Sequence, residues 1–504
     1  MASRKLGIIF LAAVILSFLT GYHASRLLPF LPIAGGGDMF EYITESFQNY
    51  YYYEIDDDAI NAAFIAHMEA TIRAYAEANN DPYTRLVATP LSAVPGDDER
   101  FVGIGISFFM EGAYLRVLDV YRGSAADGKL YPNDLITGLV VDGVDLEFVT
   151  LPDQTSILET LRGEVDTVKI LIVYDPDGIR HNVEVVYSEI LTPTAFAVDL
   201  MEEDIAYLRI TRFSEWIEDI TPGTSKVFAD RLLELETTML LDHPENKTLI
   251  LDLRDNPGGA LSALHNQGQS GLLPGIVQRL LVRDIENSVF SMIPRSGKTI
   301  LFNGGLNQPK PYHIVVLVNE QTASAAEVLA AGLHFNGGYA LYGTPTFGKD
   351  VYQNTIRLRD IRGIRYSLVY TEGRWFYNDG MSVEDTPLPV NLIEQVGLHT
   401  IDMPVYMGLT VHDEVRPGLG LYQQFFNIYY GLDGEDMLRT DHYFDDATLA
   451  IISQFQLEEG LPLTGHLDRD TAIRVHDIYM ETVHDWQQDR QLMTLIDLIK
   501  NNAS

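Results

Sequence analysis

The sequence predicts an α+β protein built from several domains, and three observations lead to this fold class. The chain has 504 residues, more than one hydrophobic core usually supports. Residues 40–87 carry a helical pattern of apolar side chains, whereas residues 100–187 consist of short strands separated by turns. From residue 205 buried strands alternate with helices, and the tail from residue 411 is helical again. We therefore expect helical, mainly-β, mixed α/β and all-α regions in that order.

Charge and composition exclude several classes of function. Acidic residues outnumber basic residues 71 to 35, which gives a net charge of −36. We expect no nucleic-acid partner, because no basic stripe is available to neutralise phosphates. The chain has no cysteine, so it can form neither a disulfide scaffold nor a thiolate nucleophile or metal site. No group of histidines and carboxylates has the spacing of metal ligands, so we expect no metal and no organic cofactor.

Residues 1–34 predict a signal anchor and linker. A basic head at Ser3-Arg4-Lys5 precedes an apolar run over residues 6–19. This pattern is typical of a signal peptide or of a short membrane anchor whose positive end stays inside. No clear small-x-small cleavage site follows, so we expect a single-pass anchor in the cell membrane with the other domains outside the cytoplasm. Cleavage would instead release a secreted or periplasmic protein.

One serine lies where a buried strand is expected to turn into a helix. Residues 314–318 form a continuous apolar run that predicts a strand buried on both faces, and residues 323–333 are rich in helix-forming residues. Ser324 therefore stands at the start of a helix. Its hydroxyl can be exposed there beside backbone N–H groups that the helix leaves unpaired, such as that of Ala325, and such groups can hold a developing oxyanion.

Lys349 follows Gly348 in a glycine turn after a second predicted strand over residues 339–342. A serine hydroxyl is a poor nucleophile until a base takes its proton, and a lysine can do so when burial disfavours its ammonium form. A serine and a lysine can thus replace a histidine-based triad. The alternative interpretation makes Ser324 a helix cap and Lys349 a solvated lysine.

These residues resemble the signature of the carboxyl-terminal processing proteases, the tail-specific Ser-Lys peptidases of family S41. In that family the nucleophile lies in a Ser-Ala-Ser-Ala-Ser-Glu-like run, and the base follows in Phe-Gly-Lys-Gly-x-x-Gln. The separation of 25 positions between Ser324 and Lys349 fits that pattern. The resemblance implies that Ser324 is the nucleophile, that Lys349 is the base and that Gln353 orients the lysine.

Three positions depart from the family pattern. Thr322 and Ala326 replace the serines that flank the nucleophile, which leaves the essential middle serine in place. Asp350 replaces the glycine after the lysine, and a carboxylate beside the amine would favour the charged form of the lysine. If this segment is extended, neighbouring side chains point to opposite faces, and Asp350 need not touch the amine.

A second motif follows a predicted buried strand over residues 248–252. Gly258 and Gly259 let the backbone approach a substrate carbonyl, and their amides could join the N–H of Ala325 in an oxyanion hole. In the family, one of the two glycines takes this role. Asp252 and Arg254 alternate along the strand, so we expect them to brace the loop through a charge pair.

His265 follows the two glycines, in a position where an ordinary serine hydrolase triad would place its base. No other feature of the sequence supports that role. We expect a structural histidine.

Residues 99–190 resemble a PDZ domain. The resemblance rests on the order in which the Gly-x-Gly at Gly103, the Gly123-Ser-Ala-Ala turn and Asp134 follow one another. The resemblance implies that backbone amides bind the terminal carboxylate of a peptide, and that the following strand accepts the peptide by edge pairing. Residues 154–161 would form the helix that lines the groove, and residues 168–174 a core strand. The alternative is a small β domain that acts as a spacer. The predicted substrate-binding residues are Gly103, Ile104, Gly105 and Ile106.

The tail resembles the small three-helix peptidoglycan-binding domain, and a last amphipathic helix is expected over residues 486–499. The same fold can also serve for dimerisation or docking. Its expected core is Ile451, Ile452, Phe455, Leu461, Leu463 and Leu467.

The resemblance implies a complete domain order and a function. A helical region over residues 35–98 precedes the PDZ domain, a mixed α/β crotonase-like S41 peptidase domain spans residues 191–405, and a peptidoglycan-binding-like domain spans residues 411–504. The implied function is that of an extracytoplasmic serine endopeptidase acting on proteins or peptides with a free C-terminus. Peptidoglycan, the membrane and a second copy of the chain are the other expected partners. The alternative is a non-catalytic envelope scaffold, a pseudo-protease, towards which only Asp350 points.

Overall fold

The computed structural model describes residues 57–90, 100–152, 154–200, 202–217, 221–266, 274–361 and 364–503. The chain forms two compact units, residues 1–86 and residues 87–504. The predicted anchor over residues 1–34 lies outside the described residues, as does the first part of the predicted helical region. Among the described residues, no helix is both long enough and apolar enough to cross a membrane.

The helix predicted over residues 40–87 extends too far. Its described part, α4 (Asp57–Glu77), ends well before residue 87, and a strand, β1 (Arg85–Pro90), follows. The reason is local: Asn80 adopts a left-handed conformation with φ of 58°, and Pro82 cannot continue a helix. Asp81 then closes a turn, because its carboxylate accepts hydrogen bonds from the backbone N–H groups of Tyr83 and Thr84.

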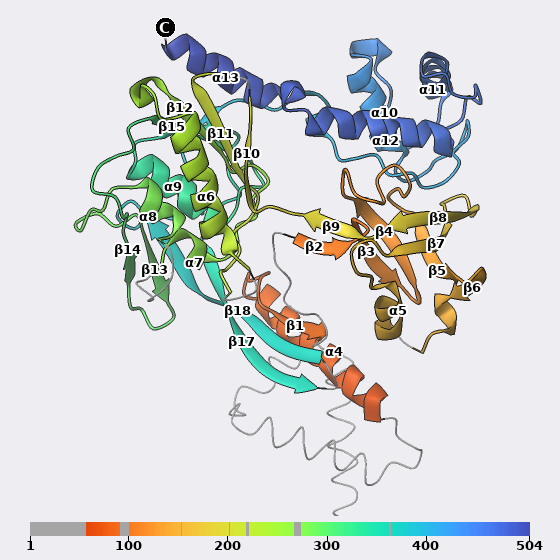
Figure 1. The fold of residues 1–504 in the computed structure, drawn as a ribbon, viewed down its shortest axis with the longest axis horizontal. Helices are drawn as coiled ribbons and strands as arrows, with labels where there is room; N and C mark the ends of the chain where they lie inside the picture. The colour runs from red at the N-terminus through yellow and green to blue at the C-terminus, as the bar shows by residue number, and fades with distance from the viewer. Residues whose placement is uncertain are drawn as a thin grey trace, which may run out of the picture. The chain divides into compact units, whose positions relative to one another are not determined.

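Residues 100–191 form a small antiparallel sheet with one helix, as the PDZ resemblance implies (Figure 1). The strand order is β3-β4-β5-β7-β8, β6 pairs with β5, and β2 pairs with β9. The predicted helix and core strand at residues 154–161 and 168–174 are confirmed as α5 (Gln154–Leu161) and β7 (Val168–Tyr174). The other elements are β2 (Arg100–Gly103), β3 (Ile106–Glu111), β4 (Tyr114–Val120), β5 (Leu135–Val141), β6 (Val144–Glu147), η2 (Phe148–Thr150), β8 (Arg180–Val186) and β9 (Ser188–Leu191).

A six-stranded sheet organises the following region, in the order β10-β11-β12-β15-β16-β19. All neighbours are parallel except β10 and β11. Both faces are covered, as the continuous apolar strands predict. The strands are β10 (Ala195–Val198), β11 (Ile205–Ile210), β12 (Thr248–Asp252), β15 (His313–Val318), β16 (Ala340–Gly343) and β19 (Val390–Leu392).

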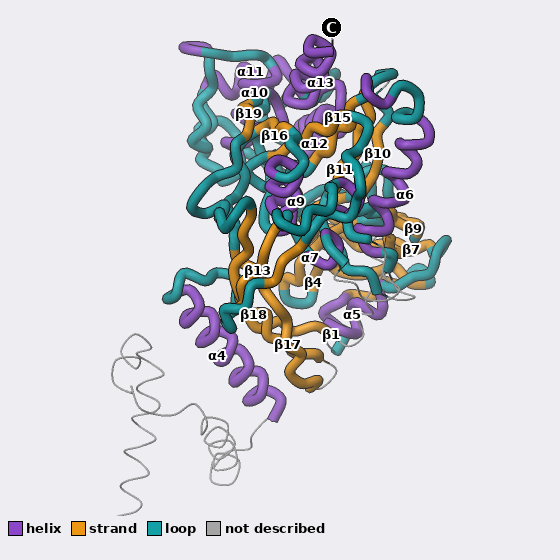
Figure 2. Tube along the Cα trace, turned by 90° about the vertical axis from the view of Figure 1, so that its left-hand side faces the viewer, coloured by secondary structure: helices purple, strands orange, loops and turns teal. Residues whose placement is uncertain are grey.

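Alternate residues of these strands serve two separate cores. Leu249 and Leu251 of β12 pack in one core with α6 (Gly223–Thr238) and α9 (Ala325–Phe335), whereas Ile250 packs in the other with the last helix, α13 (Arg490–Ala503). Figure 1 shows α13 beside the end of the sheet, and Figure 2 shows α9 against β15 and β16. The end of the chain therefore completes the fold of this sheet.

A second, antiparallel sheet contains the long hairpin of β17 (Val351–Ile361) and β18 (Ile364–Tyr377), which extends away from the six-stranded sheet (Figure 1). Strands β13 (Phe290–Pro294) and β14 (Ile300–Phe302) join β18 in this sheet. The short elements around both sheets are η3 (Pro244–Asn246), α7 (Leu261–Leu264), α8 (Ile276–Leu280) and η4 (Gly397–Thr400).

Three helices in the tail share one core: α10 (Leu419–Tyr429), α11 (Asp446–Glu458) and α12 (Arg469–His484). Asp445 and Asp468 cap α11 and α12 by accepting hydrogen bonds from backbone N–H groups. Ile452, Phe455 and Leu467 are buried as predicted, and Ile451 and Leu461 pack against them. The prediction for Leu463 is wrong, because its side chain is 67% exposed in the loop between α11 and α12.

The last helix differs from its predicted extent. A short turn, η6 (Trp486–Gln488), precedes it, and α13 begins at Arg490. Its apolar residues Leu492, Leu495 and Ile496 belong to the core of the six-stranded sheet. The other short helix of the tail is η5 (Gly434–Asp436).

This packing makes a stability prediction. Leu495 is fully buried, so Leu495→Ala should lower the free energy of unfolding by about 2–5 kcal/mol. Leu498 of the same helix is 38% exposed, and Leu498→Ala should cost less than about 1 kcal/mol. Thermal unfolding of the full chain measures both. Equal shifts for the two variants would show that α13 does not pack on the sheet in solution.

Candidate active site

Ser324 lies on the sharp turn that joins β15 to α9, as the sequence predicts. Its backbone has φ of 56° and ψ of −119°, a conformation that is strained for a residue other than glycine. Its side chain makes no cap hydrogen bond, although Ser324 occupies the N-cap position. Ser324 thus occupies the cap position of α9, as the alternative interpretation has it, and Glu327 binds its backbone N–H in a capping-box arrangement.

The loop after β12 lies beside this turn. Strands β12 and β15 are adjacent and parallel, with Asp252 opposite Leu317, so the loops that follow them emerge at the same edge of the sheet. The N–H of Ala323 donates a hydrogen bond of 3.0 Å to the carbonyl oxygen of Asn256. The two predicted motifs thus meet in space.

Glu327 joins the serine turn to the lysine loop. One of its carboxylate oxygens accepts hydrogen bonds from the N–H groups of Ser324 (2.8 Å) and Lys349 (2.9 Å), and the other accepts one from Gly348 (2.6 Å). The side chain is fully buried. Burial raises the pKa of Glu327 above its ordinary value, although these hydrogen bonds oppose the shift. This one carboxylate therefore fixes both candidate catalytic segments.

Lys349 is held at both ends. Its carbonyl oxygen accepts a hydrogen bond of 2.9 Å from the indole N–H of Trp375, and its Nζ donates one of 2.8 Å to Oε1 of Gln353. The contact with Gln353 is the one that the family resemblance implies. The Ser324 hydroxyl makes no hydrogen bond to any described residue, so the backbone and Glu327 bring the two loops together without a direct bond from the hydroxyl.

The carboxylate of Asp350 contacts Arg374 and Ser382. Its carboxylate is 3% exposed and accepts hydrogen bonds from Nε of Arg374 (2.6 Å) and from the hydroxyl of Ser382 (2.5 Å). The charge of Asp350 is therefore compensated by a guanidinium. Asp350, the feature that pointed towards a non-catalytic scaffold, thus has a guanidinium and a hydroxyl as partners.

The two glycines have different surroundings. Gly258 has φ of 97°, and a Cβ there would lie 2.8 Å from Cβ of Ser324 and 3.0 Å from the backbone nitrogen of Ala325. Its own N–H donates a hydrogen bond of 2.9 Å to Oδ1 of Asn256. Neither the N–H of Gly259 nor that of Ala325 donates a hydrogen bond within the described residues. Gly258 thus makes room beside the serine, while two neighbouring amides remain available.

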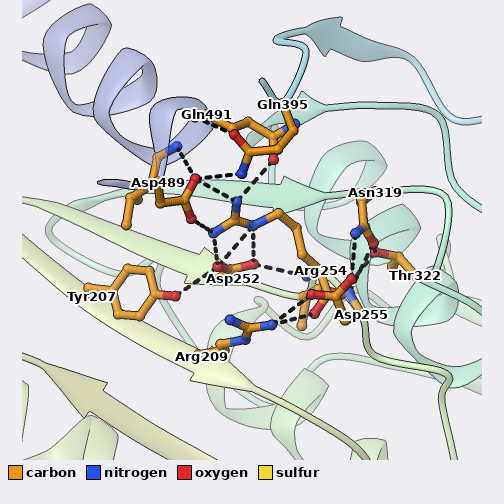
Figure 3. Close-up of polar contacts among 12 residues, drawn as sticks. Tyr207, Arg209, Asp252, Arg254, Asp255, Asn319, Thr322, Gln395, Asp489 and Gln491 are labelled. Atoms are coloured by element: carbon orange, nitrogen blue, oxygen red, sulfur yellow. Dashed lines mark hydrogen bonds and ion pairs between the residues drawn. The ribbon is translucent and has the colours of Figure 1, made fainter. Parts of the chain in front are cut away.

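The predicted charge pair behind this loop is present and buried (Figure 3). The carboxylate of Asp252 accepts hydrogen bonds from Nη2 of Arg254 (2.7 Å) and from the hydroxyl of Tyr207 (2.7 Å). The same guanidinium binds Asp489 and Gln491 near the start of α13. Burial alone would raise the pKa of Asp489, but Arg254 and the hydrogen bonds of Asp489 lower it to about 2. The loop is therefore anchored to a segment more than two hundred positions later in the chain.

His265 has a structural setting. It follows the single turn of α7, and its ring packs edge-on against Phe302 with the ring centroids 5.2 Å apart. Burial lowers the pKa of His265. Among the described residues, no hydrogen bond joins His265 to Ser324. The described residues also contain no group of histidines and carboxylates that could hold a metal ion.

The residues predicted to bind a peptide carboxylate lie at the start of β3. The carbonyl oxygens of Ile104 and Gly105 accept hydrogen bonds from the N–H groups of Ala126 and Tyr121, which fixes the loop. Gly105 has φ of 83°, and a Cβ there would collide with Ser124. Strand β3, which begins at Ile106, is at the edge of its sheet, so its outer backbone groups can pair with an added strand.

Sequence reasoning missed Glu327, Trp375 and Asp489. A local signal existed for Glu327, because Ser324-Ala-Ala-Glu327 has the spacing of a capping box, in which the glutamate binds the N–H of the capping residue. No local signal exists for Trp375 or Asp489. Their contacts with the site depend on tertiary packing.

Comparisons with known proteins find similarity to peptidases. Residues 204–390 match peptidase family S41. The chain is 24% identical over 476 residues to the carboxy-terminal processing protease CtpB of Bacillus subtilis, which covers 91% of this chain and 88% of that protein. Among solved structures, the photosystem II D1 C-terminal processing protease is 20% identical over 75% of this chain and 92% of its own, with a TM-score of 0.37. The PDZ domain of a Vibrio cholerae carboxy-terminal protease, solved with a peptide, is 21% identical over 18% of this chain and 99% of its own, with a TM-score of 0.17.

A serine on a strained strand-to-helix turn, within a domain that matches a peptidase family, defines a serine-type peptidase. Residues 204–390 are thus similar to peptidase family S41, and most of the chain is similar to a carboxy-terminal processing protease.

Glu327 provides a test of this geometry. Glu327→Ala leaves the N–H groups of Ser324, Gly348 and Lys349 without their acceptor, and each buried, unsatisfied group costs about 1–3 kcal/mol. We expect a lower melting temperature and a loss of peptidase activity of at least about 100-fold, because the nucleophile and lysine loops separate. Glu327→Gln should give an intermediate result, since the amide retains one acceptor oxygen.

Glu320 supplies the matched control. It lies on the same turn but is exposed, and its contact is a hydrogen bond from the hydroxyl of Thr344. Glu320→Ala should change activity and melting temperature little. Activity on labelled casein and thermal unfolding measure all three variants. Unchanged activity in Glu327→Ala would show that the carboxylate does not organise the site.

Proposed function

We propose that this chain is an extracytoplasmic serine endopeptidase that captures the free C-terminal tail of a protein in its PDZ domain and cuts peptide bonds with Ser324 and Lys349. One observation carries the proposal: the buried Glu327 carboxylate binds the backbone of both residues, so the two loops are built to act together. The separation of 25 positions in the family signature supports the same pairing.

The chemistry follows from the groups around Ser324. Lys349, as a neutral amine, takes the proton of the hydroxyl while Oγ attacks the scissile carbonyl carbon. The N–H groups of Ala325 and Gly259 hold the oxyanion, and Gly258 leaves space for the substrate backbone. The lysine ammonium then protonates the leaving amine. Water attacks the acyl-enzyme with Lys349 again as base, which releases the new C-terminus and restores the serine.

Two contacts favour Lys349 in this role. Gln353 accepts a hydrogen bond from Nζ, which orients the amine without adding a negative charge. The nearest carboxylate in sequence, that of Asp350, is engaged by Arg374 and Ser382. A free carboxylate beside Lys349 would favour its ammonium form. A neutral partner and a carboxylate already paired with an arginine favour that form less.

Substrate capture is assigned to the loop of Gly103, Ile104, Gly105 and Ile106 and to the free edge of β3. Backbone N–H groups of such a loop bind a terminal carboxylate, and an extended peptide pairs with the edge strand. Phe108 and Phe109 on β3 are partly exposed and offer an apolar surface to the peptide's last residues. The solved relative from Vibrio cholerae is a PDZ domain in complex with a peptide.

The remaining parts of the proposal concern location and partners. The basic and apolar pattern of residues 1–34 supports a single-pass anchor in the cell membrane with the peptidase outside the cytoplasm. The same proposal includes a crotonase-like fold for the peptidase core. The three tail helices α10–α12 support a peptidoglycan-binding or dimer-forming role by resemblance alone.

The dyad is tested with Ser324→Ala and Lys349→Ala in the chain from residue 35 onward, assayed on labelled casein. Each variant should lose at least about 1,000-fold in kcat, because nucleophile and base act as one unit. Lys298 is an exposed lysine in the same domain, and Lys298→Ala should retain full activity. If Ser324→Ala cuts as fast as the parent, the proposed nucleophile is wrong; if the parent itself is inert between pH 6 and 10, the scaffold alternative gains support.

The PDZ role is tested by binding rather than by cleavage. The Ser324→Ala chain is titrated with a fluorescent peptide ending in apolar residues, as the free acid and as the C-terminal amide. We expect the free acid to bind at least about tenfold more tightly, because the amide removes the charge that the loop amides would bind. Equal affinities would contradict capture of a free C-terminus.

A further inference from the structure

The end of the chain contacts the loop that carries Gly258. Asp489 follows η6, and its side chain is 10% exposed. Its two carboxylate oxygens accept hydrogen bonds from Nη1 (3.1 Å) and Nη2 (2.7 Å) of Arg254, in a two-point pairing (Figure 3). Gln491 adds a hydrogen bond of 3.0 Å from Nη1 of Arg254 to its Oε1. Paired contacts of this kind fix the plane of a guanidinium.

The residues that hold Arg254 are themselves fixed. The Nε2 group of Gln395 donates a hydrogen bond of 2.8 Å to Asp489, and the N–H of Leu492 donates one of 3.1 Å. Leu495 and Ile496 on the same helix are fully buried against the six-stranded sheet. The carboxylate of Asp489 is therefore attached to a rigid element rather than to a mobile tail.

From Arg254 a short path leads to the serine. The N–H of Arg254 donates to Asp252, which fixes the start of the loop after β12. Two residues later, Asn256 accepts hydrogen bonds from Gly258 through its side chain and from Ala323 through its carbonyl oxygen. Apart from Ala323, which belongs to the turn of Ser324, the residues of this path lie on the loop after β12, and Arg254 attaches that loop to the segment before α13.

We propose that the C-terminal segment supplies a positioning residue to the peptidase site: Asp489, acting through Arg254, holds the loop after β12 so that Gly258 and Gly259 stay in place beside Ser324. This inference rests on the proposed function, because it assigns those glycines to the oxyanion hole and to the space beside the serine. Asp489 does not touch the substrate. It sets the geometry of groups that do.

The charge balance explains why one carboxylate is not enough. Asp252 alone neutralises Arg254, but it binds the guanidinium from the side of β12 only. Asp489 binds from the side of α13, so the guanidinium is held between two carboxylates. Without Asp489 the guanidinium keeps Asp252 and Gln491 as partners but loses its two-point contact with the segment before α13, so the support of the loop is weakened. A displacement of about 1 Å in an oxyanion donor is enough to cost about 100-fold in rate.

The test compares Asp489→Asn with the parent in the chain from residue 35 onward. We expect kcat on labelled casein to fall about 10–100-fold with KM within about twofold, because substrate capture does not involve this loop. The rate of labelling of Ser324 by a fluorophosphonate probe should fall with kcat, since that reaction also needs the oxyanion donors. A purely structural role would lower the melting temperature without changing the labelling rate of the folded enzyme.

Glu459→Gln is the matched control, because it removes a carboxylate that accepts a 2.6 Å hydrogen bond from Arg474 within the tail helices. It should leave kcat and the labelling rate unchanged. If Asp489→Asn does not fold, Gln395→Leu removes only one of the hydrogen bonds that orient Asp489 and should lower kcat about 2–5-fold.

The outcomes separate this inference from the function beneath it. In one outcome the parent is active, Ser324→Ala is inactive, and Asp489→Asn keeps the kcat and labelling rate of the parent. This outcome overturns the positioning role and leaves the proposed peptidase function intact. A parent without activity overturns the proposed function first. Lower kcat with unchanged KM and slower labelling supports Asp489 as a positioning residue.

Discussion

The site depends on one buried carboxylate. Glu327 accepts backbone hydrogen bonds from Ser324, Gly348 and Lys349, and these residues come from two different connections of the sheet. A buried carboxylate with several donors is stable only while all of them stay in place. The same bonds hold Ser324 in a strained backbone conformation that the turn alone would not keep. The proposed nucleophile, the proposed base and the start of α9 are therefore held together by one side chain.

Parallel strands supply the frame for this unit. Strands β12 and β15 are neighbours, so the loop of Gly258 and the turn of Ser324 emerge together at one edge. The strands are buried on both faces, and two different parts of the chain cover them. Helices α6 and α9 form one core with the sheet, and α13 forms the other. The active-site edge is thus supported by the last helix of the protein.

Three arginines of this acidic chain lie at junctions between separate segments. Arg254 links the loop after β12 to α13, Arg374 compensates Asp350 next to the lysine loop, and Arg469 of α12 binds the buried Asp134 in the PDZ-like region at 2.9 Å. A planar guanidinium can bind a carboxylate at two points, so each contact fixes orientation as well as charge. With 35 basic residues against 71 acidic ones, these positions are where positive charge has a defined structural role.

The sequence by itself determined the main helices and strands and indicated the candidate reacting groups. Apolar runs and helix formers located β12, β15 and α9, and the spacing of Ser324 and Lys349 indicated a nucleophile and a base, because these signals are local. Local signals also failed where a turn overrode periodicity, as at Asn80, and where an apolar residue lay in a loop, as at Leu463. Only the tertiary structure decided that Asp350 pairs with Arg374 and that Asp489 reaches Arg254. Those contacts join residues far apart in sequence, and the packing of the sheet, not any local pattern, brings them together.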